Sequence, residues 1–401
     1  MRQGEFVALM ALLMSFVALS IDAMLPALGQ MSVSLGIQQA NDAQIVITSI
    51  FAGMGLGLVV FGPLSDIRGR KPALYAGVLI FLVGCVISRF AGSLEVMLAG
   101  RLLQGFGAAA SRVVPLAMIR DRFDGRMMAR IMSSIMMVFL LVPALAPMLG
   151  QLILKVGTWR DIFTVMILLA GVAVTWFALR APETLSRENR RALSFASLLD
   201  GAKETVRDGP ARGYTLTAGL IFGAFVGYLV SAQQLFQVQY GLGEAFPLAF
   251  GGLALPMGVS SFLNARWVES RGMVWMTTRA LVALSSSSFV FLMVVLQLGE
   301  LPPLFATVAY LGVTLFCMGF MFGNINALAM QNLKHVAGIA NSIMSASQTV
   351  LAAMIGGFIG SRFDGTMLPI TLGFFVLSVA SLAVVSRIAE PPDEKPEVEE
   401  A

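Results

Sequence analysis

The chain of 401 residues is strongly apolar, since 57% of its residues are hydrophobic and only 12% are charged. Soluble domains carry about 25% charged residues, so this composition excludes an ordinary soluble protein and favours one embedded in lipid. Cys85 and Cys317 both lie in apolar runs, and His335 is the only histidine. This inventory predicts no disulfide framework and no metal site. We also expect no nucleic-acid partner.

Apolar runs long enough to cross a bilayer as a helix, about 20 residues each, recur along the whole chain. We predict an all-α integral membrane protein with about twelve transmembrane helices. The first run, residues 6–28, is longer than the apolar core of a signal peptide, so we interpret it as a retained span. The other predicted spans are residues 43–64, 72–90, 96–118, 131–154, 159–179, 214–236, 247–265, 275–298, 302–326, 339–361 and 366–388.

Basic residues are distributed unequally between the two sides of the predicted membrane. Most of the 27 Lys and Arg fall on one side, and the opposite side has only Arg89, Lys155, Arg160 and Arg362. Because cytoplasmic loops are enriched in Lys and Arg, we expect both termini to lie in the cytoplasm. His335 falls in a loop on the same side, where we expect it to be solvated.

A polar interval, residues 180–213, separates the first six spans from the last six. We predict an N-terminal six-helix bundle at 1–179, a cytoplasmic central loop at 180–213 and a C-terminal six-helix bundle at 214–388. Such a duplication is common among secondary transporters, and the two bundles are expected to be pseudo-symmetric. The acidic, proline-containing residues 389–401 predict a disordered cytoplasmic tail.

An ordered string of small and charged residues joins the second and third spans: Gly62-Pro63-Leu64-Ser65-Asp66-Ile67-Arg68-Gly69-Arg70-Lys71-Pro72. A basic cytoplasmic loop explains an isolated cluster of this kind. The ordered string, however, resembles the signature loop of the major facilitator superfamily, which implies that family's fold of two six-helix bundles. It also implies a conformational latch in which Asp66 binds charges at the end of the fourth span, where Arg120 and Asp121 lie. The latch residues are then Gly62, Pro63, Asp66, Arg68, Gly69, Arg70, Arg120 and Asp121. A shorter echo, Glu269-Ser270-Arg271-Gly272, occupies the equivalent place in the second half.

Two charged residues lie at similar depth inside predicted spans. Asp22 is the only acidic residue well inside a span, about six residues or roughly 9 Å from its external end. Arg101, in the string Arg101-Leu102-Leu103-Gln104-Gly105, resembles the family's conserved arginine of the fourth helix. Buried charges are costly and are functional candidates by default, and we expect these two to pair when they face one another. A carboxyl at this depth can take up and release a proton as its surroundings alternate. Alternatively, Arg101 only ties two helices together, and Asp22 only caps or tethers a helix.

Two further strings resemble the twelve-helix drug:proton antiporters of the Bcr/CflA type. One is Asp22-x-x-x-Pro26 in the first span, and the other is Pro143-Ala144-Leu145-Ala146-Pro147-Met148-Leu149-Gly150-Gln151 in the fifth. The second departs from the antiporter core Gly-Pro-x-x-Gly-Gly at Ala146 and Gln151, and small residues also simply allow close packing. Pro143, Pro147 and Gly150 match the motif.

This resemblance implies export of small amphipathic compounds or drugs in exchange for protons, by alternating access. Asp22 and Arg101 would couple the proton, and no cofactor other than the proton gradient would be needed. The resemblance further implies a monomer in the bacterial inner membrane, whose partners are the substrate, protons and the lipid bilayer.

The substrate cavity is less sharply defined by the sequence. Candidate lining residues are polar, methionine or aromatic side chains at membrane depth: Arg112, Met136, Phe139, Tyr228, Gln233, Gln234, Asn324 and Asn326. Methionine and aromatic residues suit a site that adapts to several ligands, although ordinary packing accounts for many of them. Arg112 lies on nearly the same helix face as Arg101, roughly 16 Å further in. It either lines the cavity and favours electronegative or neutral drugs, or extends its charge toward the cytoplasm.

Other functions remain open at this point. An exporter of a polar metabolite or sugar on the same fold would need a cavity dominated by polar side chains. A membrane-embedded enzyme would need a nucleophile–base pair or a metal cluster within the spans, and a sensor or scaffold would need a partner domain. A single loop histidine and one buried aspartate do not supply the catalytic groups, and the short central loop and termini offer no partner domain, so we expect a transporter and not an enzyme.

Overall fold

The computed structural model describes residues 1–123, 125–186, 188, 190, 195–299, 301–333 and 336–388. Every regular element in this part of the chain is a helix, and eleven helices are long and apolar enough to cross a membrane. Helix α6, Gly125–Val156, occupies the place of the remaining predicted span and includes the apolar segment Val142–Val156. The predicted all-α membrane fold is confirmed.

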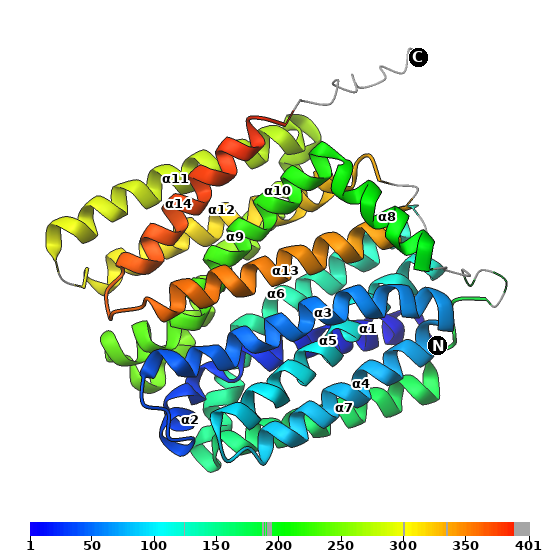
Figure 1. The fold of residues 1–401 in the computed structure, drawn as a ribbon, viewed down its shortest axis with the longest axis horizontal. Coiled ribbons are helices and arrows are strands. Elements are labelled where there is room, and N and C mark those ends of the chain that lie inside the picture. Colours follow the sequence, from blue (N-terminus) through cyan, green and yellow to red (C-terminus); the bar gives the residue numbers. More distant parts are fainter. Residues whose placement is uncertain are drawn as a thin grey trace.

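The first half of the chain forms one bundle, which lies in the lower part of Figure 1. Helix α5 packs against both α3 and α4, while α1 packs against α5, α6 and α7. The elements are α1 Gln3–Asp22, α2 Leu28–Ser34, α3 Ile45–Arg68, α4 Arg70–Arg89, α5 Leu94–Arg122, α6 Gly125–Val156 and α7 Trp159–Arg180.

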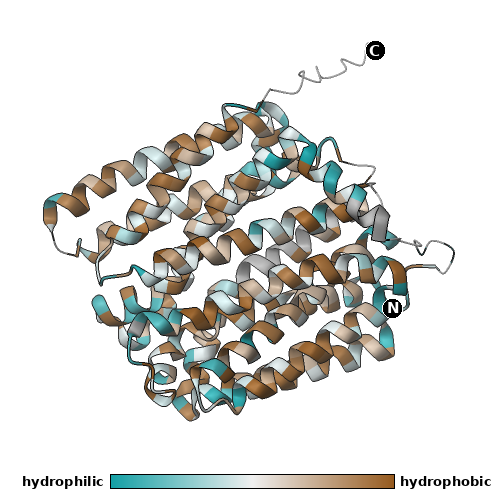
Figure 2. Ribbon diagram, in the orientation of Figure 1, coloured by the Kyte–Doolittle hydropathy of each residue, from teal (hydrophilic) through white to brown (hydrophobic). Residues whose placement is uncertain are grey.

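The second half forms the upper bundle of Figure 1, and apolar residues run along the helices of both halves (Figure 2). Its elements are α9 Gly209–Ala232, α10 Phe246–Arg271, α11 Met273–Leu298, α12 Leu304–Met330, α13 Ala337–Ser361 and α14 Leu368–Val385. The two bundles meet along two pairs of helices, α13 with α3 and α10 with α6.

Helix α1 begins, and α14 ends, at the same end of the molecule as the turn between α3 and α4 (Figure 1). We call this end the latch end, and the opposite end, which carries the turn between α6 and α7, the far end. The turn at Gly69 has φ of 105°, and its counterpart in the second half, Gly272, has φ of 79°. Only glycine adopts this left-handed backbone without strain, so the echo between the two halves is also a conformational one.

The predicted straight span 6–28 is broken. Helix α1 ends at Asp22, and a 3-10 turn at Leu25–Ala27 leads into α2. Proline has no backbone N–H, so Pro26 cannot bond to the carbonyl of Asp22 and the helix stops there. Helix α9 likewise passes into a π-helical segment, Gln233–Gln239, which contacts the 3-10 turn of the first span near the far end.

The interval 180–213, predicted as a loop, contains the amphipathic helix α8, Phe195–Arg207. Helix α9 begins at Gly209, earlier than predicted, because the Asp208 side chain accepts a hydrogen bond from the N–H of Ala211 (2.7 Å) and caps the helix. Helix α8 packs against α13 and α9.

Candidate functional site

Asp22 stands at the break of the first span. Only 4% of its surface is exposed, and its Oδ1 atom has no hydrogen-bond partner among the described residues. Buried polar atoms are usually bonded, because an unpaired one has lost its water without compensation. No hydrogen bond at Oδ1 therefore supports the interpretation of Asp22 as a capping or tethering residue.

Gly150 of the predicted antiporter motif packs directly on this break. A Cβ atom added to Gly150 would collide with the carbonyl oxygen of Ala23 and would lie 3.1 Å from Cγ of Pro26. Only glycine lets α6 approach the backbone of the first span this closely. Pro147 and the replaced position Ala146 are buried in the same helix, and Pro143 is half-buried. The motif thus holds α6 against the segment that carries Asp22.

Arg101 is fully buried and donates three hydrogen bonds. Its acceptors are the carbonyl of Ser20 (2.7 Å), the carbonyl of Val46 (3.2 Å) and Oε1 of Gln104 (2.7 Å). The Ser20 carbonyl belongs to the last turn of α1, whose carbonyls lack a full set of helical partners. Arg101 therefore joins α5 to the end of α1 and the beginning of α3.

The expected ion pair between Asp22 and Arg101 does not form in this structure. The side chain of Ser20 faces α5, because its Oγ atom lies 3.5 Å from Nε2 of Gln104. Two residues along a helix correspond to a rotation of about 200°, so Asp22 projects from the opposite side of α1, away from Arg101. Asp22 and Arg101 were predicted at similar depth in the membrane, but in this structure their side chains do not face one another.

Gln104 is a site residue that the sequence analysis missed. Its Oε1 atom accepts from Arg101, and its Nε2 atom donates to Sγ of Cys85 at 3.2 Å and to Sδ of Met166 at 3.3 Å. The available signal was its position three residues after Arg101, which places both side chains on one helix face.

Tyr228 of α9 lies in the second half of the molecule and within electrostatic reach of the Asp22 carboxyl. Its ring is buried and stacks on Phe250 of α10 at 6.2 Å between centroids, and its hydroxyl has no partner in the described part of the chain. The two buried, unpaired polar groups, one from each half, define the centre of the candidate site.

Aromatic side chains extend from Tyr228 across the boundary between the halves. Phe51 of α3 meets Phe222 of α9 at 5.7 Å, and Phe222 meets Phe322 of α12 at 6.0 Å. Phe222, Phe225 and Phe322 are only half-buried. We call the following set the central aromatic cluster: Phe51, Phe222, Phe225, Tyr228, Phe250 and Phe322.

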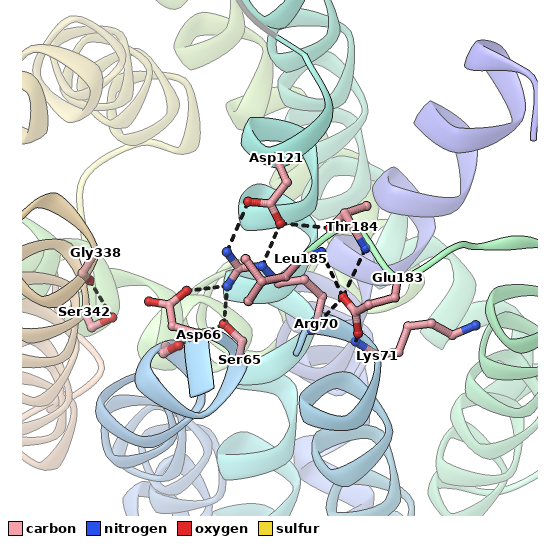
Figure 3. Close-up of polar contacts among 11 residues, drawn as sticks. Ser65, Asp66, Arg70, Lys71, Asp121, Glu183, Thr184, Leu185, Gly338 and Ser342 are labelled. Atoms are coloured by element: carbon pink, nitrogen blue, oxygen red, sulfur yellow. Dashed lines mark hydrogen bonds and ion pairs between the residues drawn. The ribbon is translucent and has the colours of Figure 1, made fainter. Parts of the chain in front are cut away.

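At the latch end, Arg70 connects the turn between α3 and α4 to α5 (Figure 3). Its guanidinium pairs with Asp66, donates to Oγ of Ser65 at 2.9 Å and donates twice to the carboxylate of Asp121, at 2.8 and 3.1 Å. The predicted contact of Asp66 with the end of the fourth span is therefore indirect, because Arg70 bridges the two carboxylates. The paired acids also neutralise the buried guanidinium.

Arg68 and Arg120, both predicted latch residues, are exposed and form no hydrogen bond or ion pair with described residues. Gly62 packs against Ser342 of α13, and Oδ2 of Asp66 would lie 3.5 Å from a Cβ atom on Gly338. Both neighbours belong to the first turns of α13, so the latch turn faces the second half of the molecule, as Figure 3 shows.

Glu183 and Thr184, which the sequence analysis treated only as loop residues, complete the latch. Glu183 accepts hydrogen bonds from the backbone N–H groups of Arg70 and Lys71, each at 3.0 Å, and so caps the first turn of α4. Thr184 donates to Asp121 at 2.8 Å. The signal was an acidic residue directly after the sixth span, on the side of the membrane where the latch lies.

The remaining cavity candidates do not share one location. Gln233 bonds to Gln237 at 2.9 Å and lies next to Gly29 in the contact between the two broken spans; Gln234 follows it in the π-helical segment. Asn324 is buried and exchanges hydrogen bonds with Asn264 at 2.8 and 3.2 Å, so it tethers α12 to α10. The side chains of Met136 and Phe139, and the whole of His335, fall outside the described residues.

Two further candidates, Asn326 and Arg112, carry polar groups that are not fully buried. Asn326 is exposed and accepts a hydrogen bond from Nε2 of Gln348 on α13 at 3.1 Å. Arg112 is half-buried and forms no hydrogen bond or ion pair within the described part of the chain.

At the far end, polar contacts join the two halves of the molecule. Lys155 at the end of α6 pairs with Glu244 at 2.8 Å. The side-chain amide of Asn41 donates to the carbonyl of Phe363 at 2.8 Å and to that of Ser361 at 3.2 Å. The far end therefore has polar ties that join its two halves.

Comparison with known proteins agrees with this architecture. The family model described as Major Facilitator Superfamily matches residues 10–357. The bicyclomycin resistance protein homolog of Haemophilus influenzae is 27% identical over 386 residues, which cover 96% of this chain and 94% of that protein. The multidrug resistance protein MdtL of Escherichia coli is 28% identical over 353 residues, which cover 84% of this chain and 85% of that protein.

Among solved structures, the D-xylose-proton symporter superposes with a TM-score of 0.72 at 15% sequence identity, over 95% of this chain and 96% of that one. Identity at this level shows a shared fold alone. The two six-helix bundles described above therefore have a direct structural counterpart over almost their whole length.

Proposed function

Because this chain belongs to the major facilitator superfamily and is thus a multi-pass membrane transporter, we propose that it exports small amphipathic compounds in exchange for protons. The names of the bicyclomycin and multidrug resistance relatives support drug efflux. Membership of this family speaks for transport and not for catalysis.

The observation that carries the proposal is Asp22, a buried carboxyl with an unpaired oxygen at the break of the first span. Its carboxyl lies within electrostatic reach of Tyr228 in the second half of the molecule, so movement of the halves changes its surroundings. In the proposed cycle Asp22 is protonated from the outside, which neutralises it and favours substrate release there. Loss of the proton to the cytoplasm restores the substrate-binding state.

Arg101 has a different role from the expected ion pair with Asp22. Since its three donors hold the end of α1, the beginning of α3 and Gln104, we assign it the fixing of the broken helix end that carries Asp22. It acts on the proton site through the backbone, as a positioning residue.

We assign the latch end to the cytoplasm of a bacterial cell with an inner membrane, and the far end to the outside. The excess of Lys and Arg at the latch end supports this orientation. With the ties Lys155–Glu244 and Asn41–Phe363 in place at the far end, the structure corresponds to a state closed to the outside. The cycle then requires those ties to break while the latch contacts of Arg70 rearrange.

The driving force is adequate for efflux. Entry of one proton down an inside-negative potential of 100 mV supplies about 2.3 kcal/mol, which sustains roughly a fifty-fold gradient of a neutral substrate. The central aromatic cluster favours amphipathic compounds over the sugar or metabolite alternative, because half-buried phenylalanines solvate a polar sugar poorly.

Transport into inverted vesicles with an imposed pH gradient tests the proposal. Phenicols, lipophilic cations and sugars would be added in turn to vesicles with wild type, Asp22→Asn and the control Asp42→Asn. Asp42 lies in the far-end 3-10 helix Ala40–Gln44, away from the α1 break. We expect proton movement evoked by amphipathic compounds in wild type and Asp42→Asn, and none in Asp22→Asn. Undiminished proton-coupled efflux in Asp22→Asn would refute the role of Asp22, and a response to sugars alone would refute drug export.

A further inference from the structure

Arg112 has no role in the cycle described so far. It lies 11 residues after Arg101 on α5, hence on nearly the same face, within about 20°. That face touches both α1 and α3 at the level of Arg101, through Ser20 and Val46. Arg112 is therefore directed between these two helices, toward the middle of the molecule and not toward lipid.

Arg112 is also too deep for its charge to reach the water at the latch end along its own helix. It precedes Arg122, the last residue of α5, by ten residues, which is roughly 15 Å and longer than an arginine side chain. Yet it is only half-buried and is unpaired among the described residues. An unpaired cation at membrane depth requires an aqueous cavity or an anion.

Polar and aromatic groups from the second half lie at a neighbouring depth. Gly55 of α3 contacts Val350 of α13, and Gly57 of α3 contacts Phe106 and Ala109 of α5. Gln348, two residues from Val350, therefore lies at about the same depth as residues 106–109 of α5. Arg112 lies one turn beyond, within roughly 5–9 Å along the axis. The hydrogen bond from Gln348 to Asn326 joins α13 to α12. Asn326 in turn donates through Nδ2 to the carbonyl of Phe322, one helical turn earlier in α12, at 2.9 Å.

We propose that Arg112 binds the carboxylate of an anionic substrate whose aromatic body rests on Phe222 and Phe322. The planar guanidinium matches a carboxylate in two parallel hydrogen bonds, and no acidic side chain of the described residues competes for it. The amides of Asn326 and Gln348, at a neighbouring depth in the second half, offer further donors. This inference rests on the proposed function and names its substrate class, amphipathic aromatic carboxylates.

The substrate charge has a measurable consequence for the cycle. Exchange of one outgoing carboxylate anion for one incoming proton moves two elementary charges in the same electrical direction. Exchange of a neutral analogue for one proton moves one. An inside-negative potential therefore drives the export of the anion twice as strongly per turnover as that of its neutral analogue.

A fluorescent diethylaminocoumarin carboxylate and its neutral carboxamide form a matched pair of probes. Binding to the purified full-length protein in detergent would be compared for wild type, Arg112→Gln and Arg112→Lys. Arg212→Gln is the control, because it removes an exposed arginine at the start of α9. We expect Arg112→Gln to weaken carboxylate binding by roughly 10- to 100-fold while carboxamide binding changes little. Arg112→Lys should retain part of the preference, and Arg212→Gln all of it.

Equal loss of both probes in Arg112→Gln, or no carboxylate preference in wild type, would overturn the proposal. Binding requires no proton coupling, so this outcome is independent of Asp22. In proteoliposomes, a charge movement per carboxylate twice that per carboxamide would support the anionic cycle, and equal charge movements would contradict it. A retained carboxylate preference without any proton movement would instead refute the proposed antiport but not the proposed site at Arg112.

Discussion

Replacing Gly150 with alanine tests how the candidate proton site is held. The added methyl group would meet the carbonyl oxygen of Ala23, its carbonyl carbon at 3.0 Å and Cγ of Pro26 at 3.1 Å. Two of these atoms are backbone and the third is a proline ring, so none can move aside as a flexible side chain could. Overpacking of this kind costs about 1–3 kcal/mol, whereas alanine in a helix interior gains about 0.5–1 kcal/mol over glycine. We expect a net loss of up to about 2.5 kcal/mol and displacement of α6 from the α1 break.

The matched control is Gly171→Ala in α7, where an added Cβ atom meets nothing within 4 Å. Thermal unfolding in detergent should show Gly150→Ala less stable than wild type and Gly171→Ala equally or more stable. In vesicles at a temperature where both remain folded, proton-coupled efflux should fall in Gly150→Ala only. Equal stability and equal coupling in the two variants would refute the view that this close approach positions Asp22.

Two further predictions concern the latch and the buried tyrosine. Arg70→Lys should slow transport strongly while leaving substrate affinity unchanged, because lysine cannot reproduce the two bonds to Asp121; Arg68→Lys, at an exposed position, should have little effect, and equal transport rates would contradict this account. Tyr228→Phe should cost no thermal stability, since the lost hydroxyl has no partner in the described structure. Tyr310→Phe should lower the free energy of unfolding by about 0.5–1.5 kcal/mol, because Tyr310 bonds to Ser288 at 3.1 Å. A larger loss of stability in Tyr228→Phe than in Tyr310→Phe would contradict the claim that the Tyr228 hydroxyl has no partner.

Much of the fold was predictable because lipid imposes a simple rule on sequence. Each crossing requires a long apolar helix, so the spans and the break between two sets of six are visible in hydropathy alone. The kink of the first span was also within reach, since Pro26 removes the partner of the Asp22 carbonyl. The π-helical segment Gln233–Gln239 was not, because its shape depends on the contact between two broken spans.

The site was predictable in residue type but less so in pairing. Asp22, Arg101 and Gly150 were each identified from their strings, yet which atoms meet depends on helix rotation. Arg101 reaches Ser20, and Asp22 projects from the other side of α1. Depth in the membrane does not give the direction of a side chain around its helix, which turns by about 200° over two residues.

The same limitation explains the latch and the asparagines. Arg70 and Asp66 belong to one string, but Glu183 and Thr184 join them from a segment more than a hundred residues away. Asn324, two residues from Asn326, pairs with Asn264 on α10 and so serves packing. Which face of α12 meets α10 is decided by tertiary structure, and no single-helix pattern contains it.

The most direct test of the account is the release of protons when substrate binds to the purified protein in weakly buffered solution. The account predicts that an amphipathic substrate displaces a proton from wild type and from Asp42→Asn. Asp22→Asn, whose neutral amide resembles the protonated carboxyl, should bind the same substrate more weakly and release no proton. Proton release of equal size from Asp22→Asn would contradict the claim that Asp22 carries the proton exchanged for substrate.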